Sequence, residues 1–374
     1  MKKAVVVASV ASMIYQFNRH NIQLLRNLGY KVIVATNFEE PGNISLAKSR
    51  QLIKELEKEG VDCVNIPFAR FPFSKDNLKA YNVLKNILDD AQVTLVHAHS
   101  PVGGVISRLL TIRRRKIRLI YTAHGFHFFK GASKKNWVIY YPIEKILSYV
   151  TDDLITINSE DYQFAIKKLN AKRTHKINGI GIDLEKFTPK KSFKRNNNQF
   201  QIISIGELNH NKNHRLVIEA IAQSRYREQI LYDICGEGVL RDDIQELIVS
   251  YGLQSQVHLL GYRDDVNLLL EKSDIFVFPS YREGLPVSIM EAMAIGLPIL
   301  ASDIRGNHDL VEHGKGGYLF TSGQLQELIS ELDTMIEHRE KLACFGVYNR
   351  EIIKEFSTEY VDKQMKRIYL LGKQ

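Results

Sequence analysis

The chain has 374 residues, of which 44% are hydrophobic and 25% charged. This composition is typical of a globular protein of two ordinary domains and excludes a disordered chain. No apolar run reaches the roughly 18 residues of a membrane-spanning helix. The three cysteines, Cys63, Cys235 and Cys344, are scattered and odd in number. They exclude a disulfide framework and favour a reducing cytoplasm.

The net charge of +9 is unevenly distributed. Residues 1–190 hold 30 Lys and Arg against 16 Asp and Glu, whereas residues 191–374 hold 21 against 26. A basic first half suits an anionic membrane surface, an anionic acceptor or nucleic acid. A solvated basic surface without a partner is equally compatible with these numbers.

Strands and helices alternate from the N-terminus. The first residues, MKKAVVVASVASMI, have the two Lys and short apolar run of a signal peptide, but 5–8 also suits a buried strand, which we favour. Further strands are expected at 31–35, 62–66, 93–98, 118–122 and 154–157, and helices at 17–28, 48–58, 75–88, 103–111 and 159–169, with Ser74 and Ser159 as caps. This alternation predicts a doubly wound α/β domain over residues 1–172, in which ligands gather at the C-terminal strand ends.

Residues 173–198 are expected to form the inter-domain connection, because they hold a turn-like Asn178–Asp183 and the polar run KKSFKRNNN. A second domain of the same type is predicted over 173–357. Its strands are expected at 201–205, 230–235, 257–260, 274–279 and 298–301, and its helices at 214–223, 242–251, 265–271, 287–294, 325–336 and 340–355. A last helix is predicted from residue 358 to the C-terminus.

The chemistry of the second domain is concentrated between residues 279 and 294. Glu283 lies in a turn-rich loop, and Glu291 lies about one turn into the following helix. Gly284 allows backbone to approach a ligand, and Pro286 suits the first turn of a helix. A helix N-terminus binds phosphate well, and a carboxylate beside it can accept hydrogen bonds from sugar hydroxyls. The alternative is that both Glu residues only balance the helix dipole.

The run EGLPVSIMEAMAIGLPILASD resembles the signature of the retaining glycosyltransferases of family 4. Their motif is matched by Glu283, Glu291, Ala292, Ala294, Gly296 and Pro298. The resemblance implies the GT-B fold, two Rossmann-like doubly wound parallel-sheet domains facing a cleft. It also implies that Glu283 faces the donor sugar and that Glu291 holds the ribose of the nucleotide. NGIGIDLEKFTP resembles the segment that opens the second domain of this family, and the last helix, about 358–374, resembles the one that crosses back to the first domain.

The loop Gly206–Lys212 joins a predicted strand to a helix. Lys212 could bind a diphosphate as a point charge, or it is a solvated loop lysine. The family usually has Gly-Arg, a gap and then Lys, with both cations on the diphosphate. Here Glu207 stands where the Arg is expected, so the second cation is unassigned, with Arg215 and Arg263 as candidates.

Gly236-Glu-Gly238 follows a strand but lacks the third Gly of a dinucleotide fingerprint, which argues against a dehydrogenase. In the family the corresponding loop contacts the nucleotide through its backbone. Arg263 either edges the base or is an exposed turn residue. The expected donor-binding residues are Gly206, Asn209, Lys212, Gly236, Arg263, Glu283, Gly284, Leu285, Pro286, Val287 and Glu291.

Histidines cluster in the first domain. His97 and His99 face one side of a strand, yet no Asp or Cys partners stand at ligand spacing, so we expect no metal site. Buried structural histidines are the alternative. The family places a His followed by Gly or Asp at a strand end facing the donor sugar, which His124 matches. The resemblance therefore gives His124, Glu283 and Lys212 as catalytic residues.

The Gly-Gly loop usual after the first strand of the family is missing. Residues 11–18 replace it, so the acceptor contacts on that side have to come from other side chains. The candidates for acceptor binding are Asn18, His99 and His127, with His20 as a further one.

Two stretches combine basic and aromatic residues, 67–73 and 130–149. Such a mixture suits a membrane interface, and core packing of the aromatic rings is the alternative. The basic run 113–116 is compatible with nucleic acid, but no nucleic-acid motif accompanies it.

We therefore expect a glycosyltransferase that moves a hexose or N-acetylhexosamine from a nucleotide-diphosphate sugar, with UDP as the favoured nucleotide, to an acceptor hydroxyl with retention. A lipid-linked sugar of capsule or exopolysaccharide biosynthesis is the favoured acceptor. No cofactor or metal is expected, nor a nucleic-acid partner, and the predicted location is cytoplasmic with peripheral contact to the inner face of the membrane. A GT-B transferase with a soluble acceptor and a non-catalytic nucleotide-sugar-binding protein are the alternatives.

Overall fold

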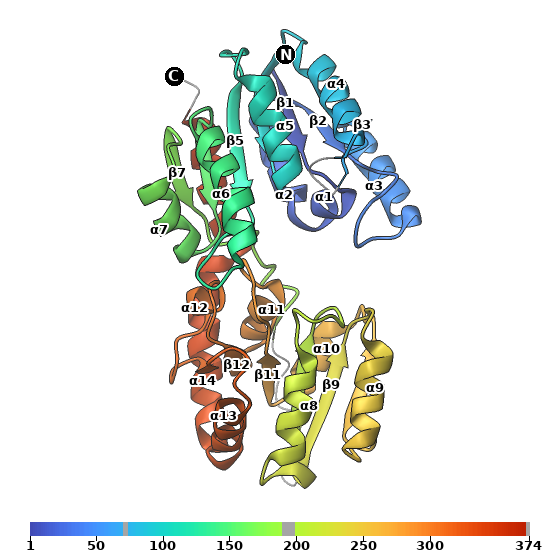
Figure 1. Cartoon of the computed structure of the whole chain (residues 1–374), viewed down its shortest axis with the longest axis vertical. Helices are drawn as coiled ribbons and strands as arrows, with labels where there is room; N and C mark the ends of the chain where they lie inside the picture. The colour runs from blue at the N-terminus through green and yellow to red at the C-terminus, as the bar shows by residue number, and fades with distance from the viewer. Residues whose placement is uncertain (70–73, 189–198, 372–374) are drawn as a thin grey trace. The chain divides into compact units, whose positions relative to one another are not determined.

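The computed structural model describes residues 1–69, 74–188 and 199–371. It consists of two compact units (Figure 1). The first unit comprises Met1–Ile180 and Val361–Gln374, and the second comprises Gly181–Tyr360. The polar run KKSFKRNNN and part of the aromatic stretch 67–73 lie outside the described residues.

The first unit is built on a seven-stranded parallel sheet. Its strand order is β3-β2-β1-β4-β5-β6-β7. Val5, Val6 and Val7 are fully buried, as expected for a central strand with helices on both faces of the sheet. The strands are β1 (Lys3–Val7), β2 (Lys31–Thr36), β3 (Asp62–Asn65), β4 (Val93–Ala98), β5 (Arg118–Ala123), β6 (Asp153–Thr156) and β7 (Arg173–Lys176).

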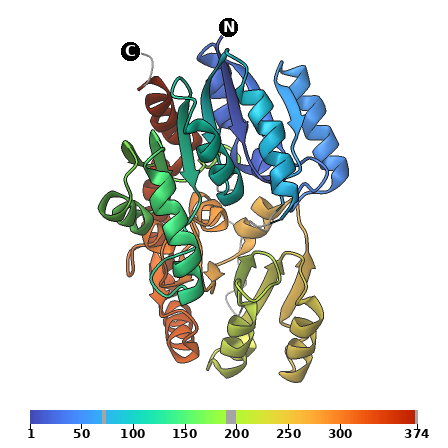
Figure 2. The ribbon, with the colours of Figure 1, turned by 45° about the horizontal axis from the view of Figure 1, so that its top comes forward.

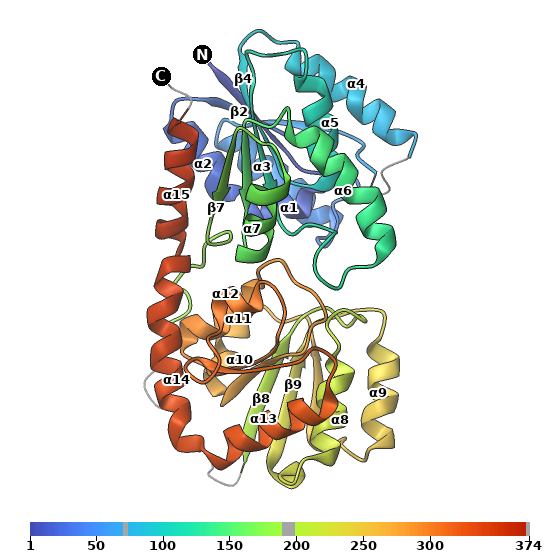
Figure 3. The same cartoon turned by 60° about the vertical axis from the view of Figure 1, so that its left-hand side comes forward.

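Helices connect successive strands of this unit (Figure 2). They are α1 (Ala11–Phe17), α2 (Arg19–Asn27), α3 (Leu46–Lys58), α4 (Asp76–Leu88), α5 (Pro101–Thr111), α6 (Lys134–Ser148) and α7 (Ser159–Lys168). The last helix of the chain, α15 (Thr358–Leu370), belongs to this unit from Val361 onward (Figure 3).

Four local predictions for this unit were wrong. One is the Ser74 cap, because the N-cap of α4 is Lys75 and has no side-chain cap hydrogen bond. The helix expected at 17–28 begins earlier and is divided into α1 and α2, and β7 lies within the segment assigned to the connection. β7 was missed because its sequence, RTHK, is polar and partly exposed, as an edge strand can be. The cap of α7 is Asn158 and not Ser159, because the Asn158 Oδ1 accepts the Asp161 N–H at 2.8 Å.

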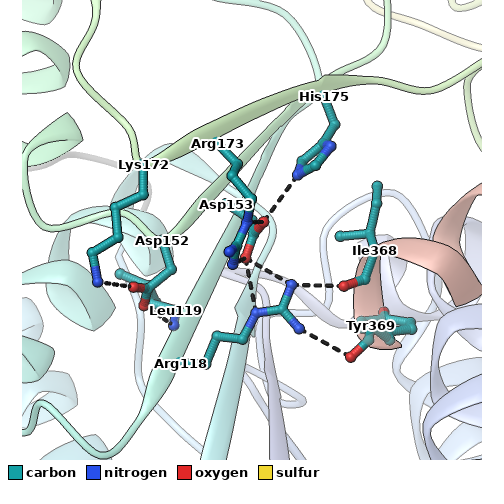
Figure 4. A network of polar contacts seen from close by, with 9 residues as sticks. All are labelled: Arg118, Leu119, Asp152, Asp153, Lys172, Arg173, His175, Ile368 and Tyr369. Carbon is teal, nitrogen blue, oxygen red and sulfur yellow. Dashed lines mark hydrogen bonds and ion pairs between the residues drawn. The ribbon is translucent and has the colours of Figure 1, made fainter. Parts of the chain in front are cut away.

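A buried carboxylate fixes β7 to the sheet (Figure 4). Asp153 on β6 is fully buried and accepts hydrogen bonds from the Arg118 Nε at 2.8 Å and from the Arg173 Nε and Nη2 at 2.6 and 2.9 Å. The His175 Nε2 lies 2.9 Å from the same carboxylate. Hydrogen bonds from these neighbours hold the pKa of Asp153 well below its usual range, although burial alone would raise it.

Arg118 also anchors the end of α15. Its Nη2 and Nη1 donate to the carbonyl oxygens of Ile368 and Tyr369 at 2.6 and 2.9 Å (Figure 4). The last carbonyls of a helix have no partner inside the helix, so a guanidinium is a suitable cap for them. Beside this network, Lys172 pairs with Asp152 at 2.6 Å.

The second unit repeats the architecture on a six-stranded sheet of order β10-β9-β8-β11-β12-β13. Its strands are β8 (Phe200–Ile205), β9 (Ile230–Cys235), β10 (Val257–Gly261), β11 (Ile275–Phe278), β12 (Ile299–Ser302) and β13 (Gly317–Phe320). Its helices are α8 (His214–Gln223), α9 (Arg241–Ser250), α10 (Val266–Lys272), α11 (Val287–Ile295), α12 (Asn307–Leu310), α13 (Leu325–Glu337) and α14 (Arg339–Ile352), with 3-10 turns at Arg227–Gln229 and Ile353–Phe356.

These two doubly wound parallel sheets confirm the predicted fold class. The sequence missed β13 and α12, which are four residues each. In each unit the strand order reverses between two neighbouring strands, β1 and β4 in the first and β8 and β11 in the second. Ligands of open α/β sheets bind at this switch point, beyond the C-terminal strand ends. Among the described residues no helix has the length and apolarity to cross a membrane.

Candidate functional site

In the second unit the loops after β8 and β11 are joined at the switch point. The Tyr281 N–H donates to the Asn211 carbonyl at 2.9 Å, and the Asn211 Nδ2 donates to the Arg282 carbonyl at 3.0 Å. Between these loops the Lys212 Nζ lies 2.7 Å from the Glu283 Oε1. Two residues that the sequence placed in separate motifs are therefore in direct contact.

The position of Lys212 is fixed from several directions. Its backbone N–H donates to the Asn209 Oδ1 at 3.0 Å, and its Nζ lies 4.6 Å from the centre of the Phe278 ring. The side chains of Lys212 and Glu283 retain only 20% and 16% of their exposure. A partly buried pair is screened less by solvent than a surface pair, so its field acts strongly on a ligand placed beside it.

Glycines let the loops after β8 and β9 pack backbone to backbone. A Cβ on Gly236, whose φ is +153°, would lie 1.9 Å from the Gly206 carbonyl oxygen. A Cβ on Gly238 would lie 2.3 Å from the Leu208 carbonyl oxygen. No side chain fits at either position. Close packing against the loop after β8 therefore explains the two glycines of Gly236-Glu-Gly238, and a third glycine is not needed for it.

Helix α11 begins directly after Pro286 and ends at Gly296, which has a φ of +89°. Pro286 needs no partner for its missing N–H, and a left-handed glycine is a common helix end. The N–H groups of the first turn of α11 have no partner inside the helix. This turn begins four residues after Glu283, the carboxylate that pairs with Lys212. The expected donor residues Gly284, Leu285 and Val287 thus line a helix N-terminus.

Glu291 lies in the second turn of α11 and is partly buried. Burial raises its pKa to about 7, and the nearby charge of Lys186 opposes this shift only partly. A carboxylate that titrates near neutral pH inside a candidate ligand site is typical of a functional residue.

Arg305, in the loop after β12, was not predicted from the sequence as a site residue. This side chain is 8% exposed, and its Nε donates to the Glu283 carbonyl oxygen at 3.1 Å. The next residue, Gly306, approaches the same loop so closely that a Cβ on it would lie 2.3 Å from the Gly284 carbonyl oxygen. The feature of the sequence that could have indicated this role is the pair Arg305-Gly306, which follows the end of a predicted strand.

Arg263 and Arg215, the candidates for a second phosphate cation, already have carboxylate partners. Arg263 forms a two-pronged pair with Asp265, at 2.8 and 2.6 Å. Arg215 pairs with Glu219 one turn along α8, at 2.7 Å. These pairs occupy both guanidinium groups in this structure, and Arg305 is a second cation, besides Lys212, that contacts the Glu283 loop.

In the first unit three histidines form a connected group at the ends of β4 and β5. The His97 ring lies between two hydroxyls, with Nδ1 2.7 Å from the Tyr369 Oη and Nε2 2.8 Å from the Thr122 Oγ1. The His99 Nδ1 lies 3.3 Å from the His124 Nε2, and the His97 and His99 ring centres are 3.9 Å apart. The group runs from α15 through the sheet to His124.

Burial keeps these rings uncharged at neutral pH. It lowers the pKa of His97 to about 3 and that of His124 to about 4, and it lowers the pKa of His99 well below its usual range. With neutral rings, one nitrogen of the His99–His124 contact donates and the other accepts. His124 therefore offers a fixed neutral hydrogen-bonding group and not a charge.

The acceptor candidates have different surroundings. Asn18 is fully buried, and its amide is used between α1 and α2, donating to the Met13 carbonyl at 3.0 Å. These contacts favour a structural role for Asn18. His99 is buried beside His124, whereas His127 is exposed and stacks on Tyr140, with ring centres 4.6 Å apart. His20 lies 3.6 Å from Asp362.

Within the described ranges no group of three or more His, Cys, Asp or Glu side chains is arranged to hold a metal ion. Lys212, Glu283 and Arg305 bring charged groups together at the switch point of the second unit. Together they can bind a ligand that has both anionic groups and hydroxyls.

Two family models match the chain. Residues 5–159 match "Glycosyl transferase 4-like", and residues 185–352 match "Glycosyl transferases group 1". The chain is 37% identical over 321 residues to the putative glycosyltransferase EpsD of Bacillus subtilis, which covers 82% of this chain and 84% of that protein. It is 30% identical over 309 residues to the UDP-Gal:alpha-D-GlcNAc-diphosphoundecaprenol alpha-1,3-galactosyltransferase of Escherichia coli, with 79% of each chain covered.

A more distant relative is the capsular polysaccharide biosynthesis glycosyltransferase CapM of Staphylococcus aureus, which is 25% identical over 293 residues, with 74% of this chain and 76% of that protein covered. Among solved structures, the chain is similar to Anabaena Alr3699/HepE in complex with UDP and glucose. The TM-score is 0.76 at 20% identity, with 99% of both chains covered. At this identity the structural match shows the fold.

Proposed function

Because this chain belongs to the family-4 glycosyltransferases of the GT-B fold, we propose that it transfers a hexose or N-acetylhexosamine from a UDP-sugar to a hydroxyl of a lipid-linked sugar. The product belongs to capsule or exopolysaccharide biosynthesis, as the names of its relatives suggest. The observation that carries the proposal is the Lys212–Glu283 pair at 2.7 Å beside the N-terminus of α11. It combines a cation for a diphosphate with a carboxylate for sugar hydroxyls.

In this mechanism the leaving group is a nucleoside diphosphate, whose negative charge grows as the glycosidic bond breaks. Lys212 and the first-turn N–H groups of α11 stabilise that charge. The diphosphate competes with Glu283 for Lys212, which leaves the Glu283 carboxylate available to accept hydrogen bonds from the sugar. Arg305 holds the Glu283 backbone in place through its hydrogen bond to the carbonyl oxygen.

The remaining roles follow the surroundings of each side chain. Glu291 accepts hydrogen bonds from the ribose hydroxyls in its ionised form. His124, uncharged and held by His99, positions the transferred sugar. Gly206, Asn209 and Gly236 shape the loops that approach the nucleotide.

The proposed chemistry uses protein cations and needs no metal ion. Turnover in EDTA should equal turnover with magnesium. A loss of activity in EDTA that magnesium restores would contradict this part of the mechanism.

We propose retention of anomeric configuration. The test is proton NMR of the product formed from an α-linked UDP-sugar, in which an α anomeric signal supports retention. A β signal would show inversion and contradict the assignment.

The function is tested by measuring UDP release from UDP-glucose, UDP-galactose and UDP-N-acetylglucosamine with GlcNAc-diphosphoundecaprenol as acceptor, the compound in the name of the galactosyltransferase relative. Acceptor-dependent release supports the proposal. Turnover with free sugars alone would favour the soluble-acceptor alternative. UDP-sugar binding without transfer to either kind of acceptor would favour a binding protein.

Membrane contact is part of the proposal, and α6 is the surface that supports it. Trp137, Tyr140 and Tyr141 pack on the core, so these three rings are not the contact. Outside the core, Val138, Ile146 and Tyr149 are 74%, 68% and 64% exposed, and their helical spacing places them on one side of α6. The exposed Lys134 and Lys135 lie on the same side.

An exposed apolar stripe with lysines suits an anionic bilayer surface. Vesicles that contain phosphatidylglycerol should carry the wild type in flotation and lose a Val138→Ser/Ile146→Ser variant. Equal flotation of the two proteins would contradict the assignment of α6.

A further inference from the structure

The first unit contains a pocket of about 220 Å³, which lies at the C-terminal ends of β4 and β5 under α6. Its walls come from Ser100, Tyr121, His124, Phe126, Tyr140 and Glu144, among others. The pocket suits one sugar ring and is too small for an oligosaccharide.

The charged group of this pocket is a carboxylate held in one orientation. The Glu144 Oε2 and Oε1 accept hydrogen bonds from the Arg108 Nη1 and Nη2 at 2.6 and 3.0 Å, and the Tyr121 hydroxyl donates to Oε1 at 3.3 Å. A carboxylate has about four acceptor sites, so these three bonds leave about one site for a ligand. Glu144 therefore presents an acceptor to the pocket.

The matching cation is shielded from the pocket. Arg108 is 1% exposed, donates to the Gly104 carbonyl at 3.0 Å and stacks over the Tyr121 ring at 4.1 Å. Burying such an ion pair costs desolvation energy, and replacing it with apolar residues is often neutral or stabilising. Core stability alone therefore does not account for this pair, whereas fixing a hydroxyl acceptor in a pocket does.

Aromatic side chains form much of the remaining wall. His127 and Tyr140 stack at 4.6 Å, and Phe126 and Phe128 stack at 4.9 Å. A small pocket with mostly apolar walls and few convergent polar groups is the usual form of a ligand site. Aromatic rings suit the C–H faces of a pyranose, and one carboxylate suits its hydroxyls. The residues that line the pocket include Glu144 but no Lys or Arg, so a uronate or a phosphate would lose its hydration there without gaining a cation.

We propose that this pocket binds the neutral terminal pyranose of the acceptor, with Glu144 accepting a sugar hydroxyl and with His127 and Tyr140 forming the stacking wall. The inference rests on the proposed function, since it names the acceptor class of the same enzyme. The pocket shares His124 with the proposed sugar-positioning group. Glu144 thus selects an uncharged sugar over an acidic one.

The single tryptophan of the chain provides a direct readout. Trp137 lies on α6, and its ring centre is 5.6 Å from that of Phe128, which lines the pocket. The full-length protein is titrated with methyl α-N-acetylglucosaminide, methyl α-glucoside and methyl α-glucuronide while tryptophan fluorescence is recorded. We expect a saturable change with at least one neutral glycoside and none with the glucuronide.

Variants locate the response. His127→Ala removes an exposed ring and should weaken binding of the neutral glycoside about tenfold, a loss of one stacking contact of about 1.4 kcal/mol. Glu144→Gln should admit the glucuronide. If that variant does not fold, the comparison of glycosides on the wild type still tests the charge selection. Tyr149→Ala, which removes a 64% exposed ring from the end of the same helix, is the matched control and should bind as the wild type does.

The possible failures are distinguishable. A wild type that transfers sugar to GlcNAc-diphosphoundecaprenol but shows no fluorescence response to the glycosides, and whose acceptor KM is unchanged by His127→Ala, overturns the pocket and leaves the function intact. Equal binding of the glucuronide overturns the role of Glu144. A response to neutral glycosides in a protein that transfers no sugar supports the pocket and overturns the proposed function.

Discussion

The two units have the same sheet topology, yet they arrange their candidate sites by different physical means. At the switch point of the second unit, a partly exposed ion pair, Lys212–Glu283, lies beside a helix N-terminus. At the corresponding position of the first unit, buried histidines are held uncharged by desolvation. One unit is suited to a charged ligand and the other to neutral hydroxyls. This difference is expected if the second unit binds an anionic donor of a type common to the family and the first unit binds an acceptor that varies among its members.

The largest expected effect is a loss of stability in the first unit. Asp153→Asn removes a buried charge that three cationic or polar neighbours surround, and it leaves Arg118 without its carboxylate. Breaking such a network should lower the free energy of unfolding by about 3–5 kcal/mol. Urea denaturation checks this value.

The pH dependence of that loss has a definite sign. The pKa of Asp153 is lowered in the folded state, so its contribution to stability is present above the unfolded pKa of about 3.9 and is lost as the pH falls below it. Asp153→Asn should therefore destabilise most near neutral pH. A loss of stability that is the same at pH 3 and pH 7 would contradict this account.

The next effect concerns the backbone contact of the second unit. Gly236→Ala places a Cβ 1.9 Å from the Gly206 carbonyl oxygen and should cost about 3 kcal/mol or more, because the backbone has to move. Gly29→Ala is the matched control in the first unit. Gly29 has a φ of +84° and open space around it, so it should cost only about 1 kcal/mol. Equal unfolding midpoints of the two variants would contradict the close approach.

Lys212→Ala tests the charge of the donor site. In the proposed mechanism this variant lacks the cation that stabilises the leaving group, so kcat should fall about 100- to 1,000-fold. Arg215→Ala, whose side chain pairs only along α8 in the described structure, should keep its kcat within about twofold. An unchanged kcat for Lys212→Ala in initial-rate assays would contradict the assignment.

Glu291 gives the donor site a pH dependence. Its pKa is raised to about 7, so the charged form is costly to bury and reduces the free energy of unfolding as the pH rises from the unfolded value through 7. In the proposed site, UDP needs that charged form for its ribose hydroxyls. Affinity should therefore increase up to about tenfold between pH 6 and 8 in calorimetric titration. A flat profile in the wild type, or an unchanged one in Glu291→Gln, would contradict the ribose role.

The smallest expected effect belongs to the first unit. Burial lowers the pKa of His124 to about 4, so this ring contributes no titration between pH 6 and 8. Any inflection of kcat/KM in that range should disappear in Glu291→Gln. An inflection that persists there and disappears in His124→Gln would contradict a neutral His124.

Much of the second unit could be predicted from the sequence, because its strands and helices are marked by apolar runs and glycines close by in the chain. Helix α8 and strand β9 match their predicted bounds, and Glu283 and Lys212 lie at loop positions as expected. Arg305 was missed because its role depends on a contact with a loop more than 20 residues away. Glu207 stands where the family has an arginine, and this substitution alone does not indicate that Arg305 contacts the Glu283 loop.

The first unit was less predictable at its site. The polar β7 and the helix α1 have no distinct local signal, and the pairing of His97 with Tyr369 joins residues 272 positions apart. The same holds for Glu144, whose partner Arg108 lies 36 residues away on another helix. The sequence identified the stretch 130–149 as basic and aromatic but could not show which rings face the core.

The most direct test of the central claim is nucleotide binding at the switch point of the second unit. Thermal unfolding is recorded with UDP, GDP and ADP in EDTA, for the wild type, Lys212→Ala and the control Arg215→Ala. Ligands that bind the folded state raise its melting temperature. The account predicts that UDP raises the melting temperature of the wild type and of Arg215→Ala and raises that of Lys212→Ala far less. No shift with UDP, or the same shift in Lys212→Ala, would contradict it.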